Sequence, residues 1–416
     1  MTLLDIEKKG AYSNLSLNEN IRKMKPGEPA FVRELVYGTL KNKYLLDHYL
    51  KSFIKRGFGS LKPEILTILR MGAYQILFMD SVPSYAAVSE SVNLSKKFAR
   101  GRESFVNGVL RSLDRGRDSL KYPEKDDFTR YLSIRYSLDP GLASRFIGIF
   151  GEEGAEEYLR ESNKTPELAI RVNLLKTGPE ELMKELEGLG FEVRRSSVTP
   201  RSLIVSGTGV LETDAFRSGR FSVQDEASTL AADILDPEPG MKVMDLCAAP
   251  GGKTAAIAEL MENRGEILAF DIYEHKLSLI EGICRRNGIQ NVKALQGDGR
   301  VFMEEHEGTS DRVLTDVPCS GLGVIRRKPE IKYRDPGNTE ELVNTQKCIL
   351  ENGARYLKAG GALVYSTCTV DPRENRMVTE AFLMSPPGYM MEREECLSPI
   401  NGTDGFYICK ILRRNI

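Results

Sequence analysis

The sequence lacks any long hydrophobic run. None of its 416 residues lies in a stretch approaching the ~18 apolar residues of a membrane span, so we expect no membrane partner. The first ten residues, MTLLDIEKKG, lack the basic stretch and apolar core of a secretory signal. The seven cysteines are odd in number without metal or disulfide spacing, and the three histidines are scattered. We therefore expect a protein of the reducing cytoplasm that holds no metal.

An excess of one charge is also lacking, since the net charge is −1, but the two signs are unevenly distributed. Residues 1–130 carry 23 Lys and Arg against 15 Asp and Glu, a net of +8. The remaining residues carry 35 against 44, a net of −9. A basic module joined to an acidic one predicts that the first part binds a polyanion. The alternative is a solvated helical surface that happens to be basic.

Internal repeats and low-complexity tracts are absent, and the chain divides into three predicted domains. Residues 1–127 show apolar residues at helical spacing throughout and predict an all-α domain. Pro63 suits the first turn of one of these helices, and Ser84 and Ser104 are candidate N-caps of two others. The polar stretch of about residues 114–127 resembles a linker.

Residues 128–235 predict linker helices followed by a small α+β subdomain of the RRM-like kind. Its strands are LAIRVNLL, FEVRRS and SLIVSG, and its helix is PEELMKELEGLG. Residues 236–416 alternate short apolar strands with helices, with strands in MKVMDL, GEILAFDI, VKALQGD, RVLTDV and GALVYSTC. This alternation predicts a Rossmann-like, doubly wound α/β domain with a parallel sheet.

A small-residue turn, CAAPGGK, joins the first of these strands to a helix. Gly251 and Gly252 allow a ligand close to the backbone, and the helix N-terminus favours a negative group. Asp271 ends the next strand, 20 residues after Gly251, where a carboxylate binds the hydroxyls of a ribose. Asp298 ends the third strand and is placed to reach an adenine. The turn therefore predicts a nucleotide-type ligand.

The turn has three alternative interpretations. CAAPGGKT nearly matches the phosphate loop of nucleotide hydrolases, but Cys247 stands where that loop has its first glycine, and Asp271 would have no role. A nicotinamide site is disfavoured because G-x-G-x-x-G is absent. The third alternative is a turn that merely connects a strand to a helix.

Two cysteines follow two adjacent predicted strands, Cys319 in TDVPCSGLG and Cys368 in YSTCTVDPRENR. A lone cysteine is most often a small buried hydrophobe. Two at neighbouring strand ends, where active sites of this architecture lie, favour catalysis instead. A thiol nucleophile, with an ordinary pKa near ~8.5, needs a nearby cation or helix N-terminus, and Lys253 is the candidate.

These motifs carry a resemblance to a known family. MDLCAAPGGK, DVPCSGLG, RRKPEI and STCTVDPREN are similar to the motif set of the RsmB (Sun/Fmu) family of RNA cytosine-5 methyltransferases. AAVSESVNLSKKF with FVNGVL resembles the family's NusB-like N-terminal RNA-binding domain, and RVN (171–173), VQDEAS (223–228) and DGFYICKILRR also resemble family segments. Val317 replaces the usual alanine and Leu322 a common threonine, which leaves the fit of the target pocket open.

The resemblance implies methyl transfer from S-adenosylmethionine to C5 of a cytosine in RNA, with small-subunit (16S) rRNA as the target. Cys368 would attack C6 and so make C5 nucleophilic, and Cys319 would assist release of the methylated base. Asp316 would hydrogen-bond N3 and lie near the donor. Asp271 would bind the donor's ribose and Asp298 its adenine. The donor's methionine part would be held by Cys247, Ala248, Ala249, Pro250, Gly251, Gly252 and Lys253.

Two functions remain besides this enzyme. An RNA-binding antitermination factor without catalysis is disfavoured because it has no use for Cys319, Cys368 and Asp271 together. A phosphate-loop ATPase would bind ATP and not S-adenosylmethionine. For the methyltransferase we expect RNA as the partner, a monomer, and no metal.

Overall fold

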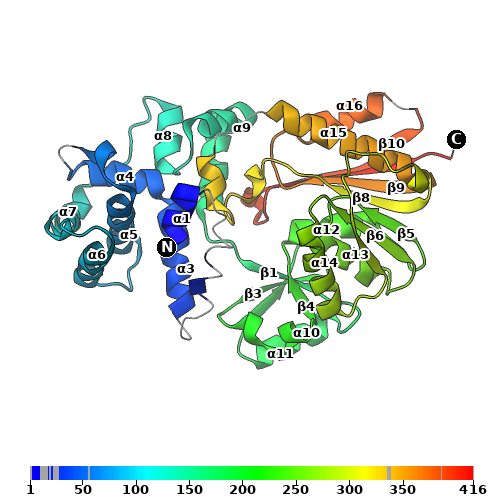
Figure 1. Cartoon of the computed structure of the whole chain (residues 1–416), viewed down its shortest axis with the longest axis horizontal. Coiled ribbons are helices and arrows are strands. Elements are labelled where there is room, and N and C mark those ends of the chain that lie inside the picture. The colour runs from blue at the N-terminus through cyan, green and yellow to red at the C-terminus, as the bar shows by residue number, and fades with distance from the viewer. Residues whose placement is uncertain are drawn as a thin grey trace. The chain divides into compact units, whose positions relative to one another are not determined.

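A computed structural model describes residues 2–9, 17, 20–21, 28–54, 57–334, 339–385 and 387–415. The chain forms two compact units (Figure 1): Met1–Lys164 with Ile325–Gly337, and Thr165–Val324 with Asn338–Ile416. The three domains 1–127, 128–235 and 236–416 are a different division and remain a prediction. Within the described residues, no helix combines the length and apolar character needed to cross a membrane.

The first unit is helical, as predicted. Its apolar core is formed mainly by α4, α5, α6 and α7, and Pro63 occupies the first turn of α5 as expected. Its helices are α1 (Thr2–Lys9), α3 (Glu28–Lys41), α4 (Lys43–Lys51), η1 (Phe58–Ser60), α5 (Pro63–Phe78), α6 (Ser84–Phe98), α7 (Glu103–Gly116), η2 (Arg117–Ser119), α8 (Phe128–Arg135), α9 (Pro140–Asn163) and η6 (Pro329–Tyr333).

The predicted N-caps Ser84 and Ser104 are wrong. Pro83 is the N-cap of α6 and Arg102 that of α7, and neither makes a side-chain capping hydrogen bond. The extended backbone of Pro83 (φ −60°, ψ 134°) begins α6 one residue earlier than a serine cap requires. Helical structure also continues through Gly116 and η2, into the stretch that resembled a linker.

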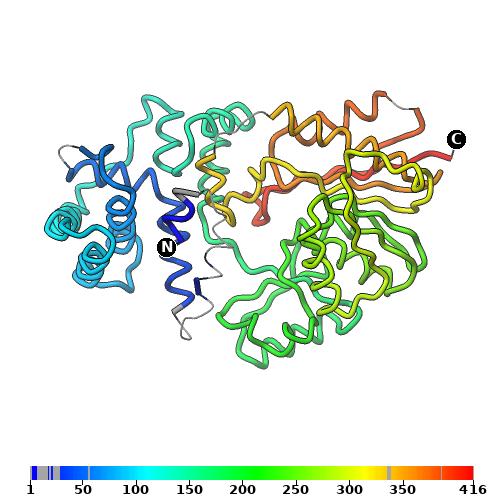
Figure 2. Tube along the Cα trace, in the orientation of Figure 1, coloured from blue at the N-terminus to red at the C-terminus, as the bar shows by residue number. Residues whose placement is uncertain are grey.

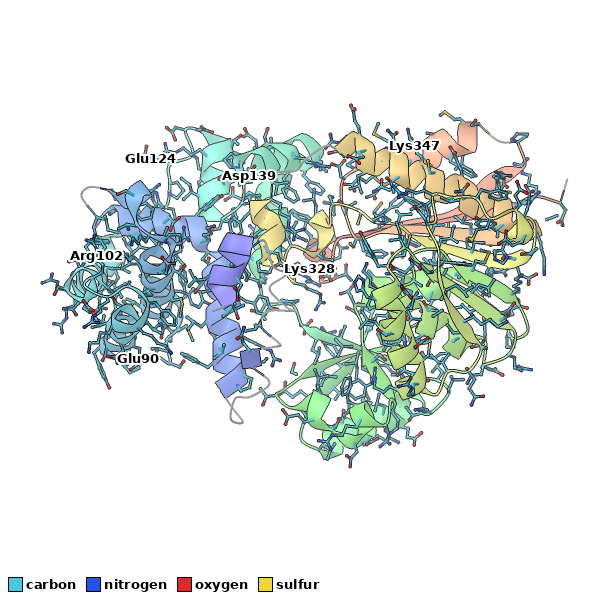
Figure 3. All side chains as sticks on the ribbon, viewed as in Figure 1. Glu90, Arg102, Glu124, Asp139, Lys328 and Lys347 are labelled. Atoms are coloured by element: carbon cyan, nitrogen blue, oxygen red, sulfur yellow. The ribbon has the colours of Figure 1, made fainter. Side chains whose placement is uncertain are left out.

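A segment distant in sequence completes the first unit. This segment contains η6, which follows the P-C-S-G motif along the chain. Figure 3 labels Lys328, the residue just before η6, and Figure 2 traces the chain through this segment. Lys332 is buried and donates hydrogen bonds to Tyr136 O (2.7 Å) and Asn163 Oδ1 (2.5 Å). Its burial lowers the pKa of Lys332 well below the usual value. No sequence pattern predicted this placement.

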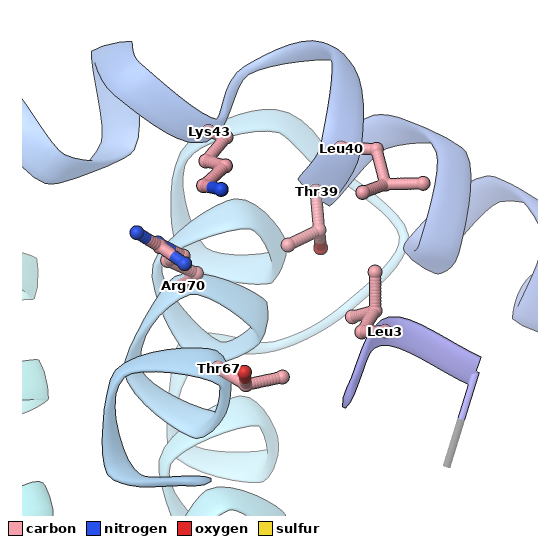
Figure 4. Close-up of a pocket in the computed structure, with 6 residues that line it drawn as sticks. All are labelled: Leu3, Thr39, Leu40, Lys43, Thr67 and Arg70. Carbon is pink, nitrogen blue, oxygen red and sulfur yellow. The ribbon is translucent and has the colours of Figure 1, made fainter. Parts of the chain in front are cut away.

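A small pocket lies among α1, α3, α4 and α5. Its volume is about 10 Å³, room for a single water molecule but not for a substrate. Figure 4 shows the residues that line it, which are Leu3, Thr39, Leu40, Lys43, Thr67 and Arg70.

The second unit contains two sheets. The smaller is antiparallel, in the order β2-β3-β1-β4, and forms the predicted α+β subdomain. Its fourth strand, β4, was not predicted, since three residues carry too little alternation to register as a strand. The elements are β1 (Leu168–Val172), α10 (Pro179–Gly188), β2 (Glu192–Arg195), β3 (Ser202–Ser206), η3 (Val210–Glu212), α11 (Asp214–Arg217) and β4 (Phe221–Val223).

The larger sheet has seven strands in the order β10-β11-β9-β8-β5-β6-β7. The five strands from β9 to β7 are parallel, as predicted. In contrast, β11 pairs antiparallel with β9 and with β10, so the whole sheet is mixed, which was not predicted. Its elements are α12 (Glu226–Leu235), β5 (Lys242–Asp245), α13 (Gly252–Leu260), β6 (Glu266–Asp271), α14 (Glu274–Asn287), β7 (Val292–Gln296), η4 (Glu304–His306), β8 (Ser310–Asp316), η5 (Leu322–Val324), α15 (Thr339–Tyr356), β9 (Leu357–Thr367), α16 (Arg376–Met384), β10 (Tyr389–Leu397), η7 (Pro399–Asn401) and β11 (Phe406–Arg413).

Helices cover both faces of this sheet (Figure 1), which confirms the doubly wound Rossmann-like fold. Alternate strand residues face two separate cores: Val243 packs with α12, α13 and α14, and Met244 with α15 and α16. The chain passes from β5 to β6 on one side, while β8 lies on the other. Ligands of open α/β sheets bind beside such a switch point, at the carboxyl ends of the strands.

Candidate active site

The turn between β5 and α13 is shaped by a glycine. Gly251 has φ +106°, a conformation that L side chains rarely adopt, and a Cβ there would lie 3.0 Å from Ile280 Cα. Glycine is therefore required at this position. The helix α13 begins at the next residue, Gly252, so its unpaired N–H groups face the turn.

Four carboxylates surround this turn. Burial raises the pKa of the Cys247 thiol well above its usual value, and the charges of Asp245, Asp316, Asp271 and Asp298 raise it further. All four carboxyl groups therefore lie within electrostatic reach of one loop residue. Three of the four are paired with cations, Asp316 with Lys253 (2.7 Å), Asp271 with Lys276 (3.7 Å) and Asp298 with Arg300 (2.7 Å), so their charge is largely balanced within the protein.

The two predicted ribose and adenine carboxylates differ in exposure and partners. Asp271 is nearly buried at the end of β6, accepts a hydrogen bond from Tyr273 N (3.0 Å) and lies 3.7 Å from Lys276 Nζ. Asp298 follows β7 and is held by both Nε and Nη2 of Arg300, at 3.0 and 2.7 Å. These hydrogen bonds lower the pKa of Asp298.

The two predicted catalytic cysteines lie in contact. Cys319 follows β8 and Cys368 follows β9, and their Sγ atoms are 3.3 Å apart. The loops that carry them are joined by a hydrogen bond between Ser320 Oγ and Thr369 Oγ1 (2.8 Å). Both thiols are partly accessible, as a reactive pair requires.

The residues on either side of Cys319 are held by a buried pair that the sequence analysis missed. Glu374 Oε2 accepts hydrogen bonds from Ser320 N (2.8 Å) and from Gln346 Nε2 (3.0 Å). Gln346 Nε2 also donates to Pro318 O (3.0 Å). The signal for Glu374 was present in DPREN, but nothing local linked Gln346, on α15, to the P-C-S-G loop.

A partly buried ion pair adjoins the cysteines. Lys253 Nζ lies 2.7 Å from Asp316 Oδ2, and Ser366 Oγ donates to Asp316 Oδ1 at 2.8 Å. Burial lowers the pKa of Lys253, but Asp316, with smaller contributions from Cys368 and Asp245, more than offsets this and raises it. Lys253 is therefore a cation within electrostatic reach of Cys368. The structure thus brings Lys253 together with Asp316 and the cysteine pair, whereas activation of a thiol by Lys253 stays a prediction.

The environment keeps Cys319 protonated. The hydrogen bond with Cys368, burial and the charges of Cys368 and Glu374 all raise the pKa of Cys319 well above its usual value. Two touching thiols cannot both ionise readily. In the described part of the chain, no group of three or more His, Cys, Asp or Glu residues is arranged to hold a metal ion.

A Rossmann-like domain with a glycine turn and acidic strand ends, preceded by a small α+β subdomain, is an architecture typical of methyltransferases. Known families match each part: residues 232–411 match the family described as 16S rRNA methyltransferase RsmB/F, and residues 1–115 match the NusB family. Residues 142–211 match the ferredoxin-like domain of the RsmF/B-like methyltransferases.

Whole-chain relatives agree with these matches. The chain is 37% identical to the probable ribosomal RNA small subunit methyltransferase B of Bacillus subtilis (strain 168), over 99% of this chain and 97% of that protein. It is 33% identical to its counterpart in Synechocystis, over 97% and 92%. The crystal structure of PH0851 superimposes with a TM-score of 0.82 at 30% identity, covering 99% of this chain and 96% of that one. The chain belongs to the ribosomal RNA small subunit methyltransferase B family.

Proposed function

We propose that this methyltransferase transfers the methyl group of S-adenosylmethionine to C5 of a cytosine in small-subunit rRNA, through a covalent bond between Cys368 and C6. Cys319 assists release of the product. The observation that carries this proposal is the pair of thiols 3.3 Å apart at two neighbouring strand ends, beside the Lys253–Asp316 ion pair. We further propose that one cytoplasmic chain is the active unit.

Donor binding is assigned to the turn and the acidic strand ends. S-adenosylmethionine supplies an electrophilic methyl group on a positively charged sulfur. The turn of Cys247 to Lys253 lets the donor's methionine part approach the backbone closely, because Gly251 and Gly252 carry no side chains. Asp271 binds the ribose hydroxyls. Asp298 binds the adenine and is oriented for this by Arg300.

Addition to the base begins with the Cys368 thiolate, which the Lys253 cation and the S–H of Cys319 stabilise. The thiolate forms a bond to C6, and electrons move from the C5–C6 double bond toward N3. The Lys253 ammonium, which donates a hydrogen bond to Asp316 Oδ2, supplies the proton that Asp316 passes to N3, and Lys253 is left neutral until that proton returns. C5 is then nucleophilic enough to take the methyl group.

Breakdown of the adduct requires a base, and we assign this role to Cys319. Once Cys368 is bonded to C6, it carries no charge, so two of the causes that raise the pKa of Cys319 disappear. The more acidic Cys319 ionises and takes the C5 proton. The C5–C6 double bond re-forms, the bond from C6 to Cys368 breaks with its electrons returning to sulfur, and N3 gives back its proton.

The test uses the full-length protein, transcribed small-subunit rRNA and a labelled donor. Cys368→Ala should abolish both methylation and any covalent complex, because no thiolate reaches C6. Cys319→Ala should form the adduct but stall at its breakdown, and so accumulate a protein–RNA complex that survives denaturing electrophoresis. Nucleoside mass spectrometry of the unsubstituted reaction should find 5-methylcytidine.

Cys396→Ala, an exposed thiol on β10, is the matched control and should behave as the unsubstituted protein. A trapped complex only in Cys368→Ala would reverse the two roles. Methylation intact in both site variants, or label in a nucleoside other than 5-methylcytidine, would contradict the proposal.

A further inference from the structure

An arginine of the small sheet is buried against α13, the helix that follows the turn of Cys247 to Lys253, here called the donor turn. Arg171, on β1, has a fully buried side chain. Its Nε donates to Glu259 Oε2 (2.9 Å) and its Nη2 to Glu259 Oε1 (2.8 Å), so the two groups form a bidentate pair. Glu259 is in the last turn of α13.

The same guanidinium also reaches the first residue of α13. Arg171 Nη1 donates to Gly252 O (2.7 Å) and to Gln224 Oε1. The Gly252 carbonyl belongs to the peptide group that carries the N–H of Lys253. A single side chain therefore holds both ends of α13 and orients the peptide at which the donor turn becomes helix.

Gln224 reinforces this contact. A Cβ at Gly252 would lie 3.7 Å from Gln224 Cδ, so the amide side chain packs directly on the first residue of α13. Arg171 and Gln224 come from RVN and VQDEAS, two segments that resembled the family but had no assigned role. Both converge on one peptide group of the donor turn.

Stability alone is a poor reason for this arrangement. Burying an Arg–carboxylate pair costs desolvation, and well-packed apolar residues often give equal or greater stability. Apolar side chains, however, provide no directed donor for the Gly252 carbonyl, and small misplacements of a binding group have large effects on function.

We propose that Arg171 is a positioning residue for the methyl donor: it fixes the Gly252–Lys253 peptide, and so makes the ferredoxin-like subdomain part of the donor-binding machinery. The proposal rests on the proposed binding of S-adenosylmethionine at this turn. It assigns Arg171 no contact with the donor itself.

The main test is the double variant Arg171→Met/Glu259→Met in the full chain, which removes both buried charges together and leaves Gly252 O without its donor. Two readouts apply. Hydrogen exchange of the Cys247–Thr254 peptide in donor-free protein should become faster. The dissociation constant for S-adenosylmethionine, measured by calorimetry, should rise about tenfold, because donor binding must then order a Gly252–Lys253 peptide that Arg171 otherwise holds.

The matched control is Arg201→Met/Asp233→Met. Arg201 is buried and Asp233 is partly buried. Arg201 donates to Ala256 O (3.3 Å) in the middle of α13 and lies 3.6 Å from Glu259 Oε2, but no bond from it to Gly252 is found among the described residues, so this control separates the Gly252 contact from the other contacts with α13. Its donor affinity should change less than about twofold and its loop exchange not at all. Arg171→Lys keeps the positive charge but loses the bidentate geometry of the guanidinium. Its donor affinity should therefore fall between those of the unsubstituted protein and the double variant.

If the double variant does not fold, Arg171→Lys tests the positioning role in its place. The positioning role would be overturned if Arg171→Lys, or a folded double variant, showed the same hydrogen exchange and the same donor affinity as the unsubstituted protein. The proposed function would then remain intact. Equal loss in the Arg201→Met/Asp233→Met control would overturn it too, since any buried pair would then suffice. No donor binding by the unsubstituted protein would overturn the proposed function as well.

Discussion

Asp245 is buried beneath the donor turn, at the end of β5. Its carboxyl accepts a hydrogen bond from Thr254 Oγ1 (2.7 Å), and only 1% of the residue is exposed. Burial raises the pKa of Asp245 to about 7, the Thr254 hydrogen bond opposes this shift, and the charge of Asp316 adds to it. In the donor-free protein, ionisation of this buried carboxyl therefore lowers the free energy of unfolding.

The sign of the resulting pH dependence follows from proton binding. Between about pH 4 and pH 7, Asp245 is protonated in the folded chain and ionised in the unfolded chain, so its contribution to the free energy of unfolding falls as pH rises. Asp245→Asn keeps an oxygen acceptor for Thr254 but cannot ionise. We expect Asp245→Asn to stabilise the donor-free protein at pH 8, by on the order of 3 kcal/mol, and to have little effect near pH 4.

Urea unfolding of both proteins at several pH values measures this difference. A constant difference across the range would mean that the substitution acts through packing and not through ionisation. Thr254→Val is a useful comparison, because it removes the hydroxyl donor but keeps the carboxyl and so should retain the pH dependence.

Among the elements, the short turn η5 joins the two cysteine loops. Gly323 N donates to Cys368 O (3.0 Å), and Gly323 O accepts from Gly405 N (2.8 Å) ahead of β11. A Cβ at Gly323 would lie 1.8 Å from Gly405 O, so any side chain must displace the turn. Gly323 follows Cys319 by four positions, so displacement of Gly323 moves the loop that carries Cys319.

Gly323→Ala should therefore lower the rate of RNA methylation by about 10- to 100-fold, because the two thiols lose their alignment. Donor affinity should remain within about twofold, since the donor turn follows a different strand. Gly282→Ala, at an exposed position of α14 with open space around it, is the control and should change neither quantity. A parallel loss of donor affinity and rate in Gly323→Ala would point to general unfolding instead.

Much of the second unit was predictable at the level of elements because its signals are local. Strand and helix periodicities located the parallel strands, and the short motifs placed Cys319 and Cys368 just beyond two of them. The hairpin of β10 and β11 was missed, because β10 (YMMEREECL) has no clear apolar alternation. The Arg171–Glu259 pair joins residues 88 positions apart, and such pairs leave no local pattern.

For the whole molecule, the division into units differs from a simple linear order. The chain passes between the units after Lys164, after Val324 and after Gly337. Removing residues 1–127 would therefore leave η6, with its buried Lys332, without much of the unit that surrounds it. A truncation is for this reason a poor test of the basic helical unit, and surface substitutions in the intact chain are better.

Lys97, Arg100 and Arg102 are suitable positions, since all three are exposed around the end of α6 and the start of α7, where Figure 3 labels Arg102. If this basic surface tracks RNA phosphates, changing the three to Glu should weaken rRNA binding and lower the slope of log affinity against log salt by about 2. S-adenosylmethionine binding should be unchanged, because the turn proposed to bind it lies in the other unit.

The matched control changes three exposed cations of the second unit, Lys184, Arg217 and Arg414, to Glu and so alters the net charge by the same amount. Filter binding over a salt series compares the two sets. A loss confined to the Lys97, Arg100 and Arg102 set assigns the phosphate contacts to the helical unit. Equal losses would show that total charge matters and not its position, and no loss in either set would return the basic excess of residues 1–130 to a solvated surface without a role in RNA binding.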